Sequence, residues 1–216
     1  MTATIAGSTG LIGSYLVEEL LKDDYFDTVR ILTRRPLDIS HPKLEKKLVD
    51  FEDADSLLVA LANTDVLFCT VGTTQKKVKG DKIAYRKVDY DIPVNLARYC
   101  KIVGCKKFIL VSSVGANSKS NNFYLRLKGE TEEAVKAVGL QSLHIMHPSM
   151  LLGNRKEARP GERIGQVLMK AVSFLLPAKY KPVQGRDVAK AMIAASKNNK
   201  TGAIICSYNE IMTLIL

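Results

Sequence analysis

Short apolar runs rich in β-branched residues alternate with helical stretches along almost the whole chain. Such runs predict strands buried on both faces, and their alternation with helices predicts a parallel sheet covered on both sides. We therefore expect one doubly wound, Rossmann-like α/β domain over residues 1–216, with its sites at the carboxyl ends of the strands. The predicted strands are residues 2–6, 28–32, 47–51, 66–71, 108–111, 140–146 and 203–206, and the predicted helices are residues 11–22, 54–62, 81–103, 122–138, 162–175 and 185–197.

Three glycines stand between the first predicted strand and the first predicted helix. Glycine permits a tight turn and lets a pyrophosphate approach the backbone, while the helix N-terminus offers N–H groups to that anion. The spacing is GxxGxxG rather than the commoner GxGxxG, and glycines also serve ordinary turns. Because of the strand-to-helix context, we expect a dinucleotide to bind at Gly7, Ser8, Thr9, Gly10, Leu11, Ile12 and Gly13.

Two arginines follow the second predicted strand, in "TVRILTRRP". Sites for NAD usually carry an acid here for the ribose 2′-hydroxyl, whereas arginine accommodates the 2′-phosphate of NADP. The first acid after this strand is Asp38, beyond a proline. We therefore expect Arg34 and Arg35 to select NADP(H), with solvation of a plain loop as the alternative.

Tyr124 and Lys128 lie four residues apart on a predicted helix, shortly after a strand that ends at Ser112 and Ser113. Side chains with this spacing are neighbours, and an ammonium group beside a phenol favours the phenolate. The tyrosine could then exchange a proton with a carbonyl or alcohol oxygen that a serine holds, and the lysine could also bind a nicotinamide ribose. The alternative is that Lys128 only faces Glu132 on a solvated helix.

These segments resemble the short-chain dehydrogenase/reductase superfamily in its atypical branch, and within it most closely the Tat-interacting oxidoreductase family. The similar segments are "GSTGLIG", "LTRRP", "VDFED", "CTVGTT", "VSSVGANSKSNNFYLRLKGE" and "LLGNRKEARPGER". The resemblance implies a Rossmann fold, NADP(H), and a catalytic set of Tyr124, Lys128 and either Ser113 or Ser112. Ser113 is preferred because the family's serines lie just past the strand end, but the sequence leaves both open.

The same resemblance implies further cofactor contacts at later strand ends. These are Asp50 and Phe51 near the adenine, Val71, Gly72 and Thr73 near the ribose, and His147, Pro148 and Ser149 beside the nicotinamide. Asp50 and Ser149 have the alternative role of turn residues. Larger relatives carry asparagine where this chain has Asp89, which argues against a water relay at that position. They also often have Arg-Pro-Gly where this chain has His-Pro-Ser.

The net charge of +10, from 32 basic and 22 acidic residues, favours anionic partners. Only 6% of the residues are aromatic and they do not interleave with the basic runs, so nucleic acid is not expected as a partner. A basic loop within residues 150–165 should lie over the substrate side, where Arg155, Arg159 or Arg163 could pair with an anionic group. The alternative is a solvated loop.

The chain has no apolar run long enough to span a membrane. Its first residues also lack the basic segment before an apolar run that is typical of a signal peptide. Its four cysteines have no CxxC spacing and no nearby histidine pair. We expect free thiols, a cytoplasmic location and no metal site.

Together these features predict an NADPH-dependent oxidoreductase that reduces a small carbonyl compound. One alternative is a catalytically silent NADP(H)-sensing protein, although a sensor has no need of a complete Ser-Tyr-Lys set. Another is a nucleotide-sugar epimerase or dehydratase, but these enzymes usually carry a substantial C-terminal substrate domain, and little sequence follows the sixth predicted strand. The sequence leaves the substrate, the reaction direction and the oligomeric state open.

Overall fold

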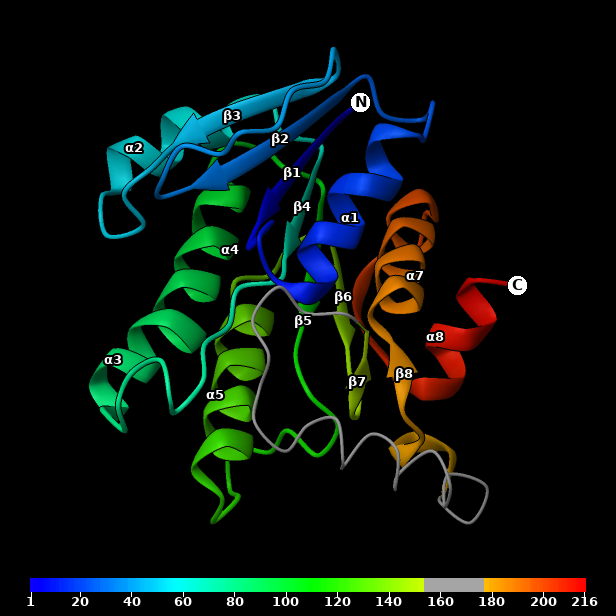
Figure 1. Ribbon diagram of the computed structural model, residues 1–216. Helices are drawn as coiled ribbons and strands as arrows, with labels where there is room; N and C mark the ends of the chain where they lie inside the picture. Colours follow the sequence, from blue (N-terminus) through cyan, green and yellow to red (C-terminus); the bar gives the residue numbers. More distant parts are fainter. Residues whose placement is uncertain (154–176) are drawn as a thin grey trace.

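The computed structural model describes residues 1–153 and 177–216, and it confirms the doubly wound α/β fold (Figure 1). Within these residues seven parallel strands form one sheet in the order β3-β2-β1-β4-β5-β6-β9. A second, two-stranded parallel sheet pairs β7 with β8. The strands are β1 (Thr2–Ala6), β2 (Thr28–Thr33), β3 (Leu44–Leu48), β4 (Val66–Cys69), β5 (Lys107–Val111), β6 (Ser142–Met146), β7 (Leu151–Leu152), β8 (Val183–Gln184) and β9 (Gly202–Cys206).

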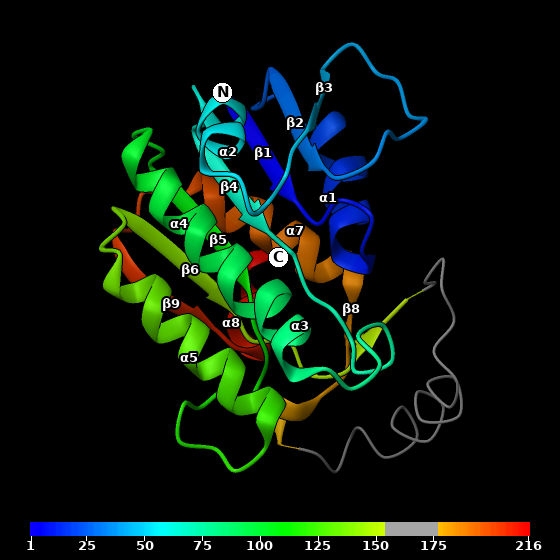
Figure 2. The same ribbon diagram turned by 90° about the vertical axis from the view of Figure 1, so that its left-hand side faces the viewer.

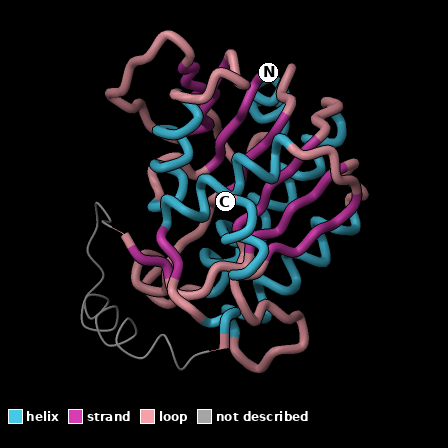
Figure 3. Tube along the Cα trace, turned by 90° about the vertical axis from the view of Figure 1, so that its right-hand side faces the viewer, coloured by secondary structure: helices cyan, strands magenta, loops and turns pink. Residues whose placement is uncertain are grey.

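Helices cover both faces of the large sheet, and each face has its own apolar core (Figures 1 and 2). One face carries α1 (Leu11–Leu21), α7 (Gly185–Lys197) and α8 (Tyr208–Leu214). Figure 3, seen from this side, shows helices lying in front of the strands. The other face carries α2 (Ala54–Leu61), α4 (Ile92–Ile102) and α5 (Phe123–Ala137). The short elements are α3 (Lys82–Arg86), the π-helical segment η1 (Lys87–Asp91) and the 3-10 helix η3 (Ala178–Tyr180).

The first helix of the chain packs against a helix that comes very late. Leu16 and Leu20 of α1 share a core cluster with Met192 of α7. Arg186 at the start of α7 donates to Glu18 at 2.7 Å, although the two residues are 168 positions apart. Elements from both ends of the chain therefore close this face of the sheet.

The predicted bounds of three strands are wrong: both ends of β3, the end of β4, and the start of β6, which begins at Ser142 rather than residue 140. β3 spans Leu44–Leu48 rather than 47–51, because it is an edge strand with exposed charged side chains and so lacks the apolar signature of a buried strand. Asp50 and Phe51 consequently lie in the turn before α2, beyond the strand end. β4 ends at Cys69 instead of residue 71. The predicted helix at 162–175 lies outside the described residues.

The long helix predicted at 81–103 is interrupted, and a proline explains where. Pro93 has no N–H to donate to the carbonyl of Asp89 four residues earlier, and its ring crowds that carbonyl. The chain adopts the wider π-helical geometry at Lys87–Asp91 before α4 begins. The Asp89 carbonyl accepts a hydrogen bond from the Thr131 hydroxyl of α5 at 3.1 Å. Asp89 is thereby held against α5 with only 1% of its surface exposed.

His144 is a buried polar residue near the centre of β6, in register with Ile109 of β5 and Ile204 of β9. Neither of its ring nitrogens has a hydrogen-bond partner among the described residues. Burial lowers the pKa of His144, and the charges of Lys107 and Lys200 act in the same direction. The folded protein therefore holds this imidazole in its neutral form.

We predict that His144→Leu makes the protein less sensitive to acid. Because the pKa of His144 is lower in the folded state than in the unfolded state, its contribution is complete above the unfolded value and is lost as the pH falls through the folded value. Urea titrations at about pH 7.5 and about pH 5.5 should give a smaller loss of unfolding free energy in the variant than in wild type. His41→Leu removes an exposed histidine and should keep the wild-type loss. An unchanged loss in His144→Leu would contradict the prediction.

Candidate functional site

The turn between β1 and α1 has room only for glycine at two positions. Gly7 has φ +91°, and a Cβ added there would lie 2.7 Å from the carbonyl carbon of Thr70. A Cβ on Gly13 would lie 2.1 Å from the carbonyl oxygen of Gly7, so α1 begins directly against the end of β1. Gly10 precedes the helix with an extended backbone. The first-turn N–H groups of α1 thus lie at the carboxyl edge of the sheet, a geometry that suits a bound anion.

The loop after the neighbouring strand β2 carries the two predicted arginines. Both Arg34 and Arg35 are exposed, directly after the strand. The Thr33 hydroxyl donates to the Arg35 carbonyl at 2.7 Å and so shapes the turn. Because β1 and β2 run parallel side by side, this loop and the glycine turn lie at the same edge of the sheet.

The turn after β3 contains Asp50 and Phe51. Phe51 is buried, whereas Asp50 is exposed and its carboxylate accepts the N–H of Glu52 at 2.9 Å. This is the turn role that the sequence offered as an alternative for Asp50.

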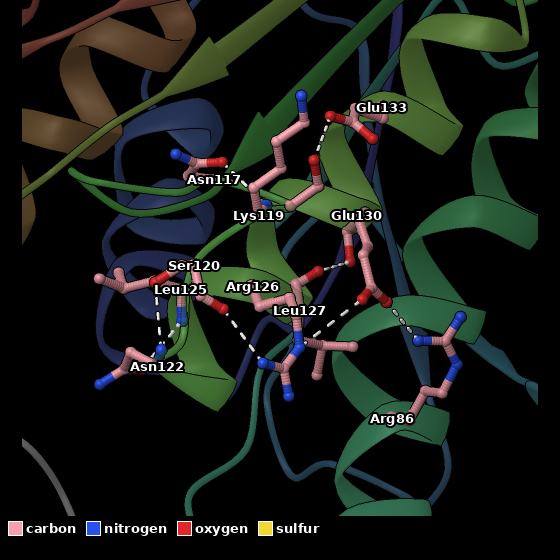
Figure 4. A network of polar contacts seen from close by, with 12 residues as sticks. Arg86, Asn117, Lys119, Ser120, Asn122, Leu125, Arg126, Leu127, Glu130 and Glu133 are labelled. Atoms are coloured by element: carbon pink, nitrogen blue, oxygen red, sulfur yellow. Dashed lines mark hydrogen bonds and ion pairs between the residues drawn. The ribbon is translucent and has the colours of Figure 1, made fainter.

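Helix α5 is fixed at its start by the polar loop that precedes it (Figure 4). The Asn122 side chain caps the helix by accepting the N–H of Leu125 at 3.1 Å. The Arg126 guanidinium donates to the Ser120 carbonyl at 3.0 Å. These contacts hold the loop after β5 against the first turns of α5, and so fix the position of Tyr124.

Tyr124 and Lys128 lie next to one another on α5, as their spacing predicts. The Lys128 ammonium lies 6.0 Å from the centre of the Tyr124 ring. Tyr124 is 37% exposed, whereas Lys128 is only 6% exposed. The hydroxyl-bearing ring is therefore accessible, while the cation beside it is buried.

The charge partner of Lys128 is Asp89, at 2.9 Å, rather than Glu132. The proposed alternative of a solvated Lys128–Glu132 pair is therefore wrong. Burial lowers the pKa of Lys128, but the charge and hydrogen bond of Asp89, together with the smaller effects of Tyr124 and Cys69, outweigh burial, so the pKa is raised overall. The second carboxylate oxygen of Asp89 accepts the backbone N–H of Thr73 at 2.7 Å. Asp89 thus connects the loop after β4, which contains Val71 and Gly72, to α5.

The two serines at the end of β5 have different surroundings. Ser112 is buried, and its hydroxyl donates to the Glu132 carboxylate of α5. Ser113 is half-buried, and among the described residues its hydroxyl makes one long contact, of 3.3 Å, to the carbonyl of Val114. Ser113 therefore has the hydroxyl that a bound molecule can engage without breaking a buried hydrogen bond.

Glu132 is a site residue that sequence reasoning missed. Besides Ser112, the same carboxylate oxygen contacts Nε2 of His147 at 2.8 Å, and the other oxygen lies 3.7 Å from the ammonium of Lys136. Glu132 is 4% exposed. Its position four residues after Lys128, on the same helix face, was the available signal. One carboxylate thus joins α5 to the ends of both β5 and β6.

The segment after β6 is anchored on three sides. The N–H of His147 donates to the Cys206 carbonyl at 2.8 Å, and the Pro148 carbonyl accepts from Val114 at 3.0 Å. The Ser149 hydroxyl donates to the carbonyl of Lys181, 32 positions later in the chain.

The predicted residues after β1, β2, β4, β5 and β6 therefore meet at one edge of the sheet. Arg155, Arg159 and Arg163 of the predicted substrate loop lie outside the described residues. Within residues 1–153 and 177–216, no group of three or more His, Cys, Asp or Glu side chains is arranged to hold a metal ion. The four cysteines are buried free thiols. No described helix is both long and apolar enough to cross a membrane.

We predict that Glu132→Ala destabilises the fold by at least about 2 kcal/mol, because it leaves the buried hydroxyl of Ser112 and the ring of His147 without their acceptor. Glu132→Gln keeps an acceptor oxygen and should cost less. Glu133→Ala, which removes an exposed carboxylate on the next residue, should change stability by less than about 0.5 kcal/mol. Urea unfolding measures all three, and equal losses for Glu132→Ala and Glu133→Ala would contradict the role of Glu132.

The chain is similar to known proteins over most of its length. A family described as NAD(P)H-binding matches residues 7–199. The protein named HTATIP2 of Rattus norvegicus is 37% identical over 161 residues, which are 73% of this chain and 66% of that relative. The mitochondrial protein FMP52 of Candida albicans is 32% identical over 212 residues, which are 94% of this chain and 91% of that relative.

Solved structures share the fold at low sequence identity. MoeE5 in complex with UDP-glucose and NAD has a TM-score of 0.74 at 17% identity, covering 99% of this chain and 80% of that one. A double mutant of the dTDP-glucose 4,6-dehydratase DesIV from Streptomyces venezuelae has a TM-score of 0.76 at 17% identity, covering 94% and 74%. At such identities the likeness establishes the Rossmann-like fold and nothing about the substrate.

Proposed function

We propose that this chain, which belongs to the NAD(P)H-binding family, is an NADPH-dependent oxidoreductase that reduces a small carbonyl compound. The observation that carries the proposal is the accessible Tyr124 beside a buried, charged Lys128 at the edge where the glycine turn lies. The glycine turn fits a dinucleotide, because such sites need a tight turn and a helix packed closely on the strand. Gly7 and Gly13 provide both, since a Cβ at either position would collide with backbone atoms. Bound NADPH supplies the hydride.

In this proposal side chains of the protein protonate the substrate oxygen and hold it in place. The Tyr124 hydroxyl donates a proton to the oxygen as it gains negative charge, and the Ser113 hydroxyl holds that oxygen by a hydrogen bond. Ser113 suits this role better than Ser112, whose hydroxyl is committed to Glu132. Lys128 lies close enough to the Tyr124 ring to stabilise the phenolate that remains. Its ammonium also binds the nicotinamide ribose.

The remaining cofactor contacts in the proposal follow the strand ends. Residues 71–73 contact the ribose and residues 147–149 contact the nicotinamide, because both segments are fixed at the carboxyl edge of the sheet. Phe51 contacts the adenine. The basic surface favours a substrate with an anionic group.

A sensing protein that binds NADP(H) without turnover is the second candidate. It needs the same turn and arginines, but not an accessible Tyr124 next to Lys128, which is why the reductase ranks first. A cytoplasmic location remains a prediction, and the relative named mitochondrial provides the alternative compartment.

We predict that the protein prefers NADPH to NADH by about ten- to hundredfold, since hydrogen bonds to charged groups contribute about 1.5–3 kcal/mol. Arg34→Ala should remove much of this preference by weakening NADPH binding while leaving NADH binding largely unchanged. Arg98→Ala removes an exposed arginine from α4 and serves as the charge-matched control. Fluorescence titration with both cofactors measures the ratio. Equal wild-type affinities for NADPH and NADH would refute the assignment.

We predict that Tyr124→Phe lowers turnover by about 10²–10⁴-fold while folding and NADPH affinity persist, because only the proton-donating hydroxyl is removed. A panel of aldehydes and ketones, followed by NADPH absorbance, first identifies a substrate that wild type reduces. Ser113→Ala should act mainly on turnover, and Ser112→Ala should act less on turnover and more on stability. Wild-type turnover by Tyr124→Phe would move the sensing function to first place.

A further inference from the structure

Asp89 is the one described carboxylate that contacts both the tyrosine–lysine helix and the loop after β4. Its Oδ1 lies 2.9 Å from the ammonium of Lys128, and its Oδ2 accepts the N–H of Thr73 at 2.7 Å. Its backbone carbonyl accepts from the Thr131 hydroxyl. The side chains of Asp89 and Lys128 are 2% and 8% exposed. Asp89 therefore has fixed partners at both ends and almost no contact with solvent.

The position of Asp89 depends on a distortion that the sequence imposes. Pro93 prevents the regular α-helical hydrogen bond to the Asp89 carbonyl, and the π-helical segment results. Segments of this kind are rare and frequently occur at functional sites. Here the distortion accompanies the only buried aspartate among the described residues, directed at Lys128.

The charge of Lys128 depends on this carboxylate. The groups that influence Lys128 are Asp89 from η1, Tyr124 from its own helix and the Cys69 thiol of β4. Burial raises the pKa of Cys69 to about 11, so this thiol is neutral near pH 7. Glu132, one turn further along α5, faces Ser112 and His147 instead. Asp89 is thus the carboxylate that compensates for the cost of burying the ammonium.

We infer that Asp89 is a positioning residue of the cofactor site, which keeps Lys128 in its ammonium form and holds the loop after β4 at the distance that bound NADPH requires. This inference rests on the proposed function, in which Lys128 serves the nicotinamide ribose. It gives residue 89, where larger relatives carry asparagine, a role other than a water relay. The charge of Asp89, and not only its hydrogen bonds, is the property that matters.

Asp89→Asn tests this role, because the amide oxygen can still accept from Thr73 while the charge is gone. In wild type the pKa of Lys128 is raised, so the ammonium persists up to alkaline pH and NADPH affinity should stay level between about pH 7 and about pH 9.5. In the variant, burial acts without the opposing charge of Asp89, so Lys128 should lose its proton within this range. We expect NADPH affinity of the variant to fall by about tenfold across it, beyond any change in wild type.

Asp91→Asn is the matched control, since Asp91 lies on the same segment and is half-buried. It should keep the wild-type profile. Parallel profiles for Asp89→Asn and wild type would overturn the inference. The binding measurement needs no substrate, so it separates the two proposals. Wild-type turnover by Tyr124→Phe would contradict the reductase but leave the Asp89 result standing, whereas a wild type that binds no NADPH overturns both.

A double variant covers the case in which Asp89→Asn does not fold. Asp89→Asn with Lys128→Met removes both buried charges, so neither is left unpaired. It should fold, bind NADPH at least about tenfold more weakly than wild type, and show no change in affinity with pH over the same range. Wild-type NADPH affinity in the double variant would overturn the inference.

Discussion

Two buried carboxylates attach helix α5 to the sheet, and the arrangement of the candidate site depends on them. Asp89 reaches Lys128 from the segment before α4, and Glu132 reaches the ends of β5 and β6 from α5 itself. A buried charge is tolerated only when it is paired and hydrogen-bonded, so each carboxylate restricts the helix to one position. Apolar packing under α5 could accept a small shift along the sheet, whereas these contacts could not.

This attachment separates residues that look equivalent in the sequence. Ser112 and Ser113 are neighbours, but strand alternation turns the first toward α5, where Glu132 accepts its hydroxyl. It leaves the second half-buried, with a long contact to the Val114 carbonyl as its one hydrogen bond within the described part of the chain. Lys128 is buried in the same way, while Tyr124 one turn earlier remains accessible. Burial thus separates Ser112 and Lys128 from Ser113 and Tyr124, whose hydroxyls are the ones that the proposed reaction uses.

The fold and the glycine turn were predictable, because a parallel sheet leaves periodic apolar runs and close backbone contact demands glycine at Gly7 and Gly13. The ends of β3 were not, since a charged edge strand carries no apolar signature. Helix α8 was missed although Ser207 and Glu210 form a capping box at its start. The partner of Lys128 could not be predicted from neighbouring residues, because Asp89 lies on a different helical segment. Its position there depends on the distortion that accompanies Pro93, four residues later.

The contact between α1 and α7 has a consequence for synthesis of the chain on the ribosome. The glycine turn and α1 leave the ribosome long before α7, the helix that covers the apolar side of α1, since Arg186 and Glu18 are separated by 168 positions. Leu16 and Leu20 must therefore wait for their partner in α7 until the intervening strands and helices have been synthesised. A nascent chain of this protein lacks the cover of this hydrophobic helix face until α7 has emerged, and transiently exposed apolar surface is the kind that chaperones bind.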